Sequence, residues 1–431
     1  MRVPTLTGVA VLIQLCLAEL QEPLGDKSSE NDTPLNEAFN KRVEWALEHY
    51  NIPGLAVGVV RDGQEFAKGY GFANITSGAP VTADTLFFAG STTKAHTAAA
   101  ISLLVDDNTK YPHIQWDTPV YSLIPEVFSL SDPYYTTHIT ITDMLSHRSG
   151  LPRHDTILLQ NLTTKEILLR MKHLPLTAEI RTESQYCNLM YITAAYLVES
   201  VTGHSLDSFL HENIWSVLGM TSTTLDLSAA KAAGSHVAEG YYTSLETNKS
   251  IPTNQAYTPA VTGAGNILTS AADYNKWIST LLAQNLPISK SGYNALFSPH
   301  SLADPVNGPP VTPPFGSPNL YGFGWFLQTY KGERIIQHGG AQVGFGAFVL
   351  LLPDRGFGLS ILGNDMLGTN DATQILAFEL IDTFLGLKEE DRFDWAGVYV
   401  LPIHLFFSFV HVNYFFFSGF PSNLPNNLTI S

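Results

Sequence analysis

A serine and a lysine stand three residues apart at the start of an apolar segment, FFAGSTTKAHTAAAISLL (residues 87–104). From Ala95 onward this segment is rich in Ala, Leu and Ile, a composition typical of a buried helix. Ser91 and Lys94 lie one helical turn apart, so the amine can reach the hydroxyl. Because a buried lysine is costly unless its pKa shifts or a partner relieves it, this pair indicates an activated serine nucleophile. A serine helix cap beside a lysine that extends to solvent is the alternative.

Spacing alone does not identify a nucleophile, because Ser228 and Lys231 repeat the same Ser-x-x-Lys pattern. The context of Ser91 is different: it follows Gly90 at the junction between a strand-like run and an Ala-rich helix. At such a junction, unpaired backbone amides and the helix dipole favour negative charge. The sequence therefore favours Ser91 as the reactive serine.

Two further short motifs carry groups that could assist a nucleophile. Tyr186-Cys187-Asn188 precedes a second Ala/Leu/Tyr-rich helix and is the only Tyr-x-Asn among the 18 tyrosines. His338-Gly339-Gly340 lies in a strand-like run, and its two glycines allow a ligand to approach the backbone. Taken singly, a buried tyrosine beside a capping residue and a structural histidine are the alternatives.

The elements that must position these motifs can be read from the pattern of apolar residues. A hairpin is indicated where two β-rich runs flank Asp62-Gly63, and a short helix where a Thr cap begins the segment 139–155. Other helices are expected over residues 36–51, across much of 156–285 and over 371–387, and strands over 321–364.

The two β-rich regions lie at opposite ends of this stretch, with helices between them. We expect them to pair into a single antiparallel sheet flanked by helices, with a helical subdomain inserted. The fold class is therefore α+β, in one mixed domain that covers residues 38–387. The chain shows no internal repeat.

The three motifs Ser-Thr-Thr-Lys, Tyr-Cys-Asn and His-Gly-Gly, in this order, resemble the signatures of the serine β-lactamase and penicillin-binding protein superfamily. The resemblance is to the branch of class C β-lactamases, D-aminopeptidases and esterases, and most to its fungal members. It implies a β-lactamase/transpeptidase-like fold over Ala38 to Leu387. Three further stretches resemble segments of this branch, with Val217 where it has proline: TITDMLSHRSGLPRHD, SVLGMTSTTLD and GAGNILTSAADYNKW.

The resemblance assigns a role to each residue of the motifs. Ser91 is expected to form an acyl-enzyme, and Lys94 and Tyr186 to move its proton as one unit. Asn188 is expected to hydrogen-bond Lys94 and the substrate. The backbone N–H groups of Ser91 and Ala341 are expected to form the oxyanion hole.

The resemblance also places His338 among the catalytic residues, and it is here that this sequence departs from the β-lactamases, which usually have Lys-Thr-Gly at this place. A mostly neutral histidine lacks the positive charge that faces a substrate carboxylate, and Gly339 lacks the hydroxyl of threonine. The strand at Gly339 and Gly340 is still expected to bind substrate. The departure predicts poor β-lactamase and carboxypeptidase activity, and better hydrolysis of neutral esters or amides.

Composition excludes several other classes of function. The 431-residue chain has a net charge of −16 and lacks a long basic run, so nucleic acid and anionic membrane surfaces are not expected partners. Neither a Gly-x-Ser-x-Gly nor a His-Glu-x-x-His motif occurs, and the 14 histidines show no ligand spacing, so neither metal nor cofactor is predicted. The expected partner is a small-molecule or peptide-like acyl substrate. The sequence leaves the oligomeric state open.

The N-terminus has the pattern of an export signal. Residues 1–18 combine Arg2 with a short apolar run, which predicts a signal peptide rather than the alternative of a buried strand; residues 19–37 form a polar leader. Cys16 would leave with the signal, and Cys187 would have no disulfide partner. Secretion, with glycosylation at some or all of the Asn-x-Ser/Thr sites, is therefore predicted. These sites are Asn31, Asn74, Asn161, Asn248 and Asn427.

The C-terminal tail, residues 388–431, contains an apolar segment at 398–420. That segment is long enough to cross a bilayer but includes Pro402 and two histidines, so the alternatives of a membrane span and a misassigned gene end stay open.

The sequence also leaves alternatives open for the function of the protein. A secreted serine hydrolase is preferred, an acyltransferase or transesterase of secondary metabolism would use the same site, and a non-catalytic binding protein would keep only the fold.

Overall fold

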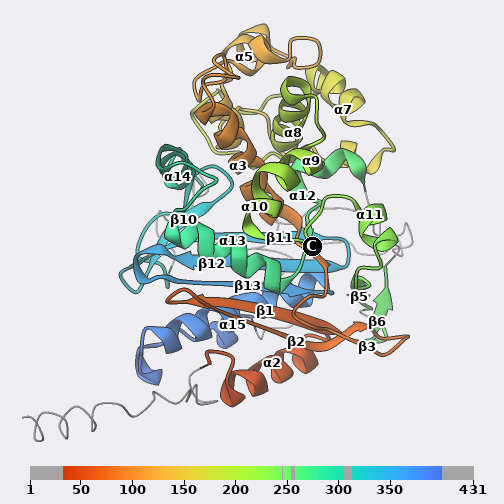
Figure 1. Cartoon of the computed structure of the whole chain (residues 1–431), viewed down its shortest axis with the longest axis vertical. Coiled ribbons are helices and arrows are strands. Elements are labelled where there is room, and N and C mark those ends of the chain that lie inside the picture. Colours follow the sequence, from red (N-terminus) through yellow and green to blue (C-terminus); the bar gives the residue numbers. More distant parts are fainter. Residues whose placement is uncertain (1–32, 245, 254–257, 304–312, 400–431) are drawn as a thin grey trace, which may run out of the picture.

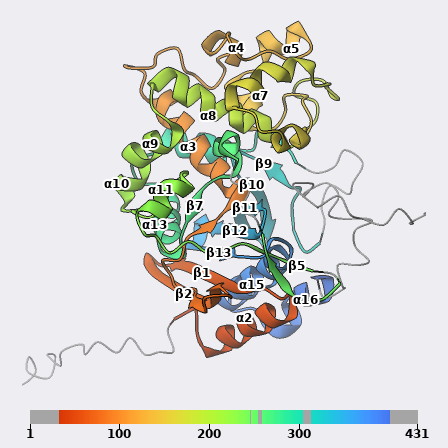
Figure 2. The ribbon, with the colours of Figure 1, turned by 90° about the vertical axis from the view of Figure 1, so that its right-hand side faces the viewer.

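The computed structural model describes residues 33–244, 246–253, 258–303 and 313–399. Within them the chain forms one large sheet with helices on both faces and a helical region above the sheet (Figures 1 and 2). Every strand pairing in this sheet is antiparallel. This is the architecture expected from the sequence, a single antiparallel sheet flanked by helices with an inserted helical subdomain.

The large sheet has nine strands among the described residues. Their order across the sheet is β3 (Ala79–Pro80), β2 (Gln64–Asn74), β1 (Gly54–Arg61), β13 (Phe357–Gly363), β12 (Phe345–Leu352), β11 (Glu333–Gln342), β10 (Phe326–Tyr330), β9 (Leu320–Tyr321) and β8 (Ser301–Leu302). Two small sheets pair β4 (Phe87–Phe88) with β7 (Leu268–Thr269), and β5 (Tyr241–Thr243) with β6 (Ser250–Pro252).

The central strands are buried on both faces, which explains their nearly continuous apolar sequences. Along β1, Leu55, Val57 and Val59 belong to the hydrophobic core on one side of the sheet, and Ala56 and Val60 to the core on the other. This alternation is the two-residue period of a strand. The predicted hairpin is confirmed, because Asp62 and Gly63 adopt positive φ angles of 52° and 77° between β1 and β2.

Helices cover the sheet and build the inserted subdomain. The α-helices are α2 (Glu37–His49), α3 (Thr93–Asp106), α4 (Val120–Leu123), α5 (Pro133–His138), α6 (Ile141–Leu145), α7 (Thr164–Arg170), α8 (Asn188–Thr202), α9 (Leu206–Leu210), α10 (Ser216–Leu218), α11 (Leu227–Ala232), α12 (Thr262–Gly265), α13 (Ala271–Ala283), α14 (Lys290–Phe297), α15 (Met366–Phe384) and α16 (Trp395–Tyr399). Short 3₁₀ turns include η1 (Gly90–Thr92), η2 (Asp155–Leu159), η3 (Met171–His173), η5 (Pro259–Val261), η6 (Pro353–Arg355) and η7 (Glu389–Asp391), and η4 (His211–Trp215) is a π-helix.

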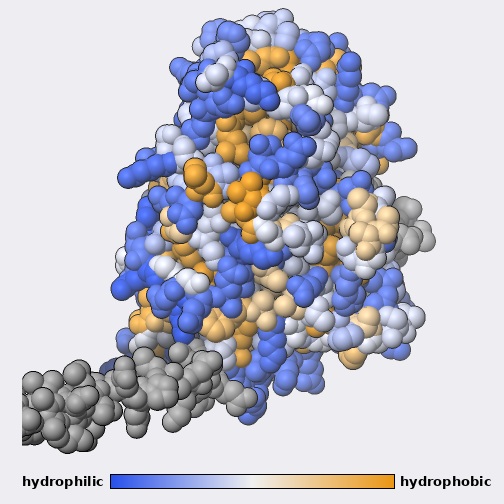
Figure 3. Space-filling view, in the orientation of Figure 1, coloured by the Kyte–Doolittle hydropathy of each residue, from blue (hydrophilic) through white to orange (hydrophobic). Residues whose placement is uncertain are grey.

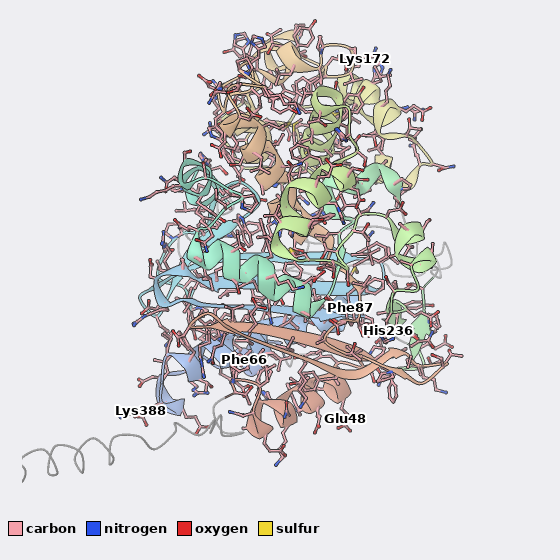
Figure 4. The ribbon with its side chains drawn as sticks, viewed as in Figure 1. Glu48, Phe66, Phe87, Lys172, His236 and Lys388 are labelled. Atoms are coloured by element: carbon pink, nitrogen blue, oxygen red, sulfur yellow. The ribbon has the colours of Figure 1, made fainter. Side chains whose placement is uncertain are left out.

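The helices form two layers around the sheet. α13 packs on β1, β2 and β13, while α15 packs on β12 and β13 and contacts α2 on the other face. Figure 4 labels Glu48, in α2, near one end of the molecule and Lys172, in the helical region, at the other. α3 rises from the sheet into that region (Figures 1 and 2), so its first turn lies where sheet and subdomain meet.

The surface in Figure 3 mixes hydrophilic and hydrophobic residues, and hydrophobic ones gather near the middle of this face, around α10. Val217 of α10, which stands where the resembled segment has proline, is 60% exposed.

Several local predictions of secondary structure are confirmed. Thr140 begins α6 with a capping box to Asp143, and the strands expected over 321–364 are present.

The ends of the folded region extend slightly beyond the predicted domain limits. Asn36 caps α2 through its side chain, and Leu35 is buried. Past residue 387 the chain turns back, and Trp395 of α16 stacks on Phe378 of α15 with ring centroids 4.2 Å apart. Residues 388–399 therefore pack against the domain. The reason is aromatic burial on α15, which no periodic pattern in this stretch indicates.

Several sequence predictions lie wholly or mostly outside the described residues and stay predictions. They are the signal peptide with Cys16, the polar leader up to residue 32, Asn31, Asn427 and the apolar segment beyond residue 399. Among the helices that the structure describes, none is both long and apolar enough to span a membrane.

Candidate active site

Ser91 lies at the junction between the sheet and the helical subdomain. β4 leads into it, and β4 pairs with β7, which brings the segment around residue 264 close to α3. The tight turn η1 is fixed by hydrogen bonds from the Thr92 N–H to the Ala89 carbonyl and from the Thr93 hydroxyl to the Gly90 carbonyl. Ser91 is partly exposed, whereas the residues that follow it are buried. The hydroxyl thus stands at the surface end of a buried helix.

Two glycines allow β11 to contact this turn at the backbone. Gly90 has φ +50°, and a Cβ there would lie 2.4 Å from the Ala341 nitrogen. A Cβ on Gly340 would lie 2.1 Å from the Ala89 carbonyl oxygen. Neither separation is possible for a real side chain, so glycine at both positions is what brings the Ala341 amide next to the serine turn.

The direction of the Ala341 N–H follows from the strand register. Two-residue hairpin loops join β10 to β11 and β11 to β12, so the pairs Tyr330–Glu333 and Gln342–Phe345 are hydrogen-bonded pairs. Counting in steps of two, the odd-numbered residues of β11 face β10. β10 pairs with β11 only up to Gln337, and no described strand covers that side of residues 339–342. The Ala341 N–H therefore points out of the sheet beside Gly90, as an oxyanion-hole donor must.

Lys94 connects the serine to two other segments. Its Nζ lies 3.0 Å from Ser91 Oγ, 2.8 Å from Asn188 Oδ1 and 2.8 Å from the carbonyl oxygen of Ala264. Among the described residues these three atoms are its hydrogen-bond partners. Asn188 Oδ1 and the Ala264 carbonyl are pure acceptors, so they take two N–H groups. A neutral amine would then direct its lone pair at the Ser91 hydroxyl, which is the geometry of a general base.

The electrostatics of Lys94 favour that neutral form. The side chain is fully buried, and burial lowers its pKa well below 10.5; the nearby Arg153 lowers the pKa further, and Asp155 and the Cys187 thiol oppose this. A cation out of water is disfavoured, so desolvation has the largest influence. The lysine is buried, as its place in an apolar helix leads us to expect.

Tyr186 lies beside the lysine, as the sequence motifs predict. Lys94 Nζ lies 4.8 Å from the centroid of the Tyr186 ring and 5.5 Å from that of Tyr191. Tyr186 is partly exposed, and Asn188 begins α8 two residues later. Tyr186, which is distant in sequence, therefore lies at the same place as Ser91 and Lys94.

His338 is buried, and both of its ring nitrogens have partners. Nδ1 lies 2.6 Å from the Gly339 carbonyl, which can only accept, so Nδ1 carries the proton. Nε2 then accepts from the Tyr321 hydroxyl at 3.3 Å. Burial, with a smaller influence from Lys94, lowers the pKa of His338 to about 3. The imidazole is therefore neutral, as predicted from the departure at this position.

Sequence reasoning missed two charged residues at the site, Arg153 and Asp155. Both carboxylate oxygens of Asp155 lie 3.0 Å from Asn188 Nδ2, and Arg153 Nε donates to Asp155 Oδ2. The guanidinium carbon of Arg153 lies 5.4 Å from the Tyr186 ring centroid. Their signal is present in the segment LPRHD, which the resemblance marks only as part of a longer similar stretch.

His147 is a third residue of the site that was not singled out. It has φ +58° and is buried, and its Nδ1 accepts the N–H of Cys187 at 3.1 Å. Its ring centroid lies 4.3 Å from that of Tyr186. His147 thus supports the Tyr186–Asn188 segment through both backbone and ring. The repeated Ser-x-x-Lys pattern, in contrast, is far from such partners: Ser228 and Lys231 are exposed on α11.

The fold and the geometry around Ser91 together define the class of protein. The family model described as "Beta-lactamase" matches residues 36–381, and the chain belongs to this family. Two fungal proteins are similar over most of the chain. The "Unguisins hydrolase ungD'" of Aspergillus campestris is 38% identical over 381 residues, which are 86% of this chain and 70% of the relative. The "Unguisins hydrolase ungD" of Aspergillus violaceofuscus is 36% identical over 395 residues, 87% of this chain and 69% of the relative.

Solved structures show the same fold. The octameric penicillin-binding protein homologue from Pyrococcus abyssi has a TM-score of 0.71 at 22% identity and covers 82% of this chain and 78% of its own. A class C β-lactamase from Rhodobacter sphaeroides has a TM-score of 0.65 at 19% identity, and the match covers 81% of this chain and 100% of the β-lactamase chain. The chain is a serine hydrolase of the β-lactamase family, as the sequence motifs predict.

Proposed function

We propose that this protein hydrolyses an ester or amide bond through an acyl-enzyme on Ser91. The observation that supports this most is the position of Lys94 Nζ, 3.0 Å from Ser91 Oγ, with its other two partners pure acceptors. Lys94, with Tyr186 beside it, takes the hydroxyl proton while the serine oxygen attacks the acyl carbonyl. The backbone N–H groups of Ser91 and Ala341 stabilise the oxyanion, a contribution of several kcal/mol in comparable sites.

The acyl group then leaves Ser91 when water attacks the ester. Both fungal relatives are named hydrolases of unguisins, so unguisins belong in the first substrate panel, next to nitrophenyl esters and D-amino-acid amides. The test is intact mass during turnover. The proposal requires a transient mass increase equal to the acyl group, located on the peptide that contains Ser91. Turnover of every active substrate without such an adduct would contradict it.

Neutral acyl substrates are expected to react better than penicillins. Because His338 is buried and neutral, it supplies no fixed positive charge for a substrate carboxylate. A charge-assisted hydrogen bond contributes about 1.5–3 kcal/mol, so its loss weakens recognition by about 10- to 100-fold. We expect kcat/KM for p-nitrophenyl butyrate to exceed that for benzylpenicillin by at least about 10-fold.

The methyl ester of benzylpenicillin provides the control for this comparison. Where a protein cation recognises the carboxylate, esterification lowers kcat/KM; here it should leave kcat/KM nearly unchanged. Comparable rates for benzylpenicillin and the nitrophenyl ester, or a large loss on esterification, would show that a cation at this site serves the penicillin carboxylate after all.

We also propose that the protein is secreted. The support comes from the sequence of residues 1–18 and from the sequons, of which Asn161 and Asn248 are exposed in the described region, where a glycan could be attached. Recovery from culture medium of a chain that lacks residues 1–18 and loses mass on glycosidase treatment is the expected result. A chain retained in the cytosol with its initiator Met would contradict the proposal.

A further inference from the structure

Asn188 contacts a carboxylate on the side opposite to Lys94. Its Nδ2 lies 3.0 Å from each oxygen of Asp155, and its Oδ1 lies 2.8 Å from Lys94 Nζ. Asp155 is the last residue of the segment LPRHD and the first residue of η2, and its side chain is 12% exposed. The carboxylate is therefore held close to the catalytic lysine with a single amide between them.

This contact determines the orientation of the Asn188 side-chain amide. A carboxylate can only accept hydrogen bonds, so the amide nitrogen must face Asp155 and the oxygen must face Lys94. If the amide were reversed, its oxygen would face the carboxylate, and its NH₂ group would face the N–H groups of the amine. Both arrangements are repulsive, so Asp155 selects the orientation in which Asn188 accepts from Lys94.

Arg153 completes the arrangement from the same loop. It forms an ion pair with Asp155, and its guanidinium lies against the ring of Tyr186. The anion and the cation act on Lys94 in opposite senses, because Asp155 raises its pKa and Arg153 lowers it. The titratable and charged groups that face Lys94 are Arg153, Asp155, Tyr186, Cys187, Tyr191, His147 and His338.

We propose that Asp155, held by Arg153, is a positioning residue that acts through Asn188 to fix the donor and acceptor directions around Lys94. It does not touch the substrate. Without it, the Asn188 amide can reverse, the amine loses one of its two acceptors, and its lone pair is no longer directed at Ser91. This inference rests on the proposed acylation of Ser91.

A double-mutant cycle between Asp155→Asn and Asn188→Ala tests the proposal with p-nitrophenyl butyrate as substrate. Asp155→Asn alone should lower kcat by about 10- to 100-fold with little change in KM, since residues in one hydrogen-bond network couple strongly. In the Asn188→Ala background the same substitution should cost less than about 3-fold. Glu379→Gln, at an ion pair with Arg42 on α2, is the matched control and should leave kcat unchanged.

The pH dependence of kcat/KM separates this role from a general loss of structure. The active form needs neutral Lys94, so activity falls as the pH drops through the pKa of that lysine. Removing the anion with Asp155→Asn should move this acidic limb to lower pH. Removing the cation with Arg153→Gln should move it to higher pH, and this more exposed residue supports the test even if Asp155→Asn folds poorly.

Additive effects in the double-mutant cycle, or limbs that stay in place or move in the same direction, would overturn the proposal. Such a result leaves the proposed function untouched, provided that the wild-type protein still forms the adduct on Ser91. Absence of that adduct in the wild type would instead refute the proposed function.

Discussion

Replacing Ser91 with alanine is expected to lower ester turnover by at least about 10⁴-fold, because loss of a serine nucleophile removes the covalent route altogether. Only the oxyanion donors and substrate binding would then remain. The substitution removes a partly exposed hydroxyl and leaves the surrounding turn intact. Stability should therefore change little. Steady-state hydrolysis of p-nitrophenyl butyrate, with intact mass after a fluorophosphonate probe, measures the effect.

The chain supplies its own control for this experiment. Ser228 has the same Ser-x-x-Lys spacing but is exposed on α11, away from the tyrosine and histidine motifs. Ser228→Ala should keep full activity and still take up the probe. If Ser91→Ala retained most of its activity, or if the probe mass appeared on another residue, Ser91 would not be the nucleophile.

Lys94→Ala and Tyr186→Phe should each lower kcat/KM by about 10³-fold, within the range that a positioned acid or base supplies. The double variant should lose little more than either single one, because the two groups act on the same proton. Their proximity motivates this expectation, with Lys94 Nζ 4.8 Å from the Tyr186 ring centroid. Rates of acylation measured in a single turnover provide the test.

Lys94→Arg separates the two roles that a lysine can have here. A guanidinium stays charged at all accessible pH values, so it keeps the cation but cannot accept the serine proton. We expect it to be as inactive as Lys94→Ala. In the wild type, burial holds the pKa of Lys94 well below 10.5, so the neutral amine and the activity should persist well below pH 10.5 and be lost on further acidification. Lys231→Ala, in the exposed pattern on α11, should change nothing.

Near-wild-type activity in Lys94→Arg would show that the side chain acts as a cation, with the proton taken elsewhere. Strictly additive losses in the double variant would mean that Lys94 and Tyr186 act in separate steps.

The residues at the centre of the site could be predicted because they break the pattern of their own surroundings. Lys94 interrupts an apolar helix, and His338-Gly339-Gly340 places a histidine and two glycines within a strand-like run. A polar group inside an apolar element needs a partner, so its presence is informative. Gly340 is a second signal, because a Cβ at this position would lie 2.1 Å from the Ala89 carbonyl oxygen and only glycine fits.

Arg153 and Asp155 could not be found in this way, because they lie in a loop where charged residues are ordinary. Asp155 is important because it contacts Asn188 across 33 positions of sequence, and Arg153 because it forms an ion pair with Asp155. Trp395 was missed for a related reason: its partner Phe378 lies on α15, and the polar stretch around it shows no periodicity. Contacts that depend on the tertiary arrangement leave no trace in local spacing.

The pairing of β1 with β13 has a consequence for biosynthesis. Leu55 is opposite Gly363. β1 is the first strand of the large sheet to leave the ribosome and β13 is the last, so one edge of β1 has no hydrogen-bonding strand until β13 has been synthesised. Contacts of such sequence separation slow folding and expose apolar edges meanwhile. A nascent chain stalled before residue 357 would present Leu55, Val57 and Val59 without the strand that lies beside them. Chaperone assistance should therefore matter most during the final stage of translation.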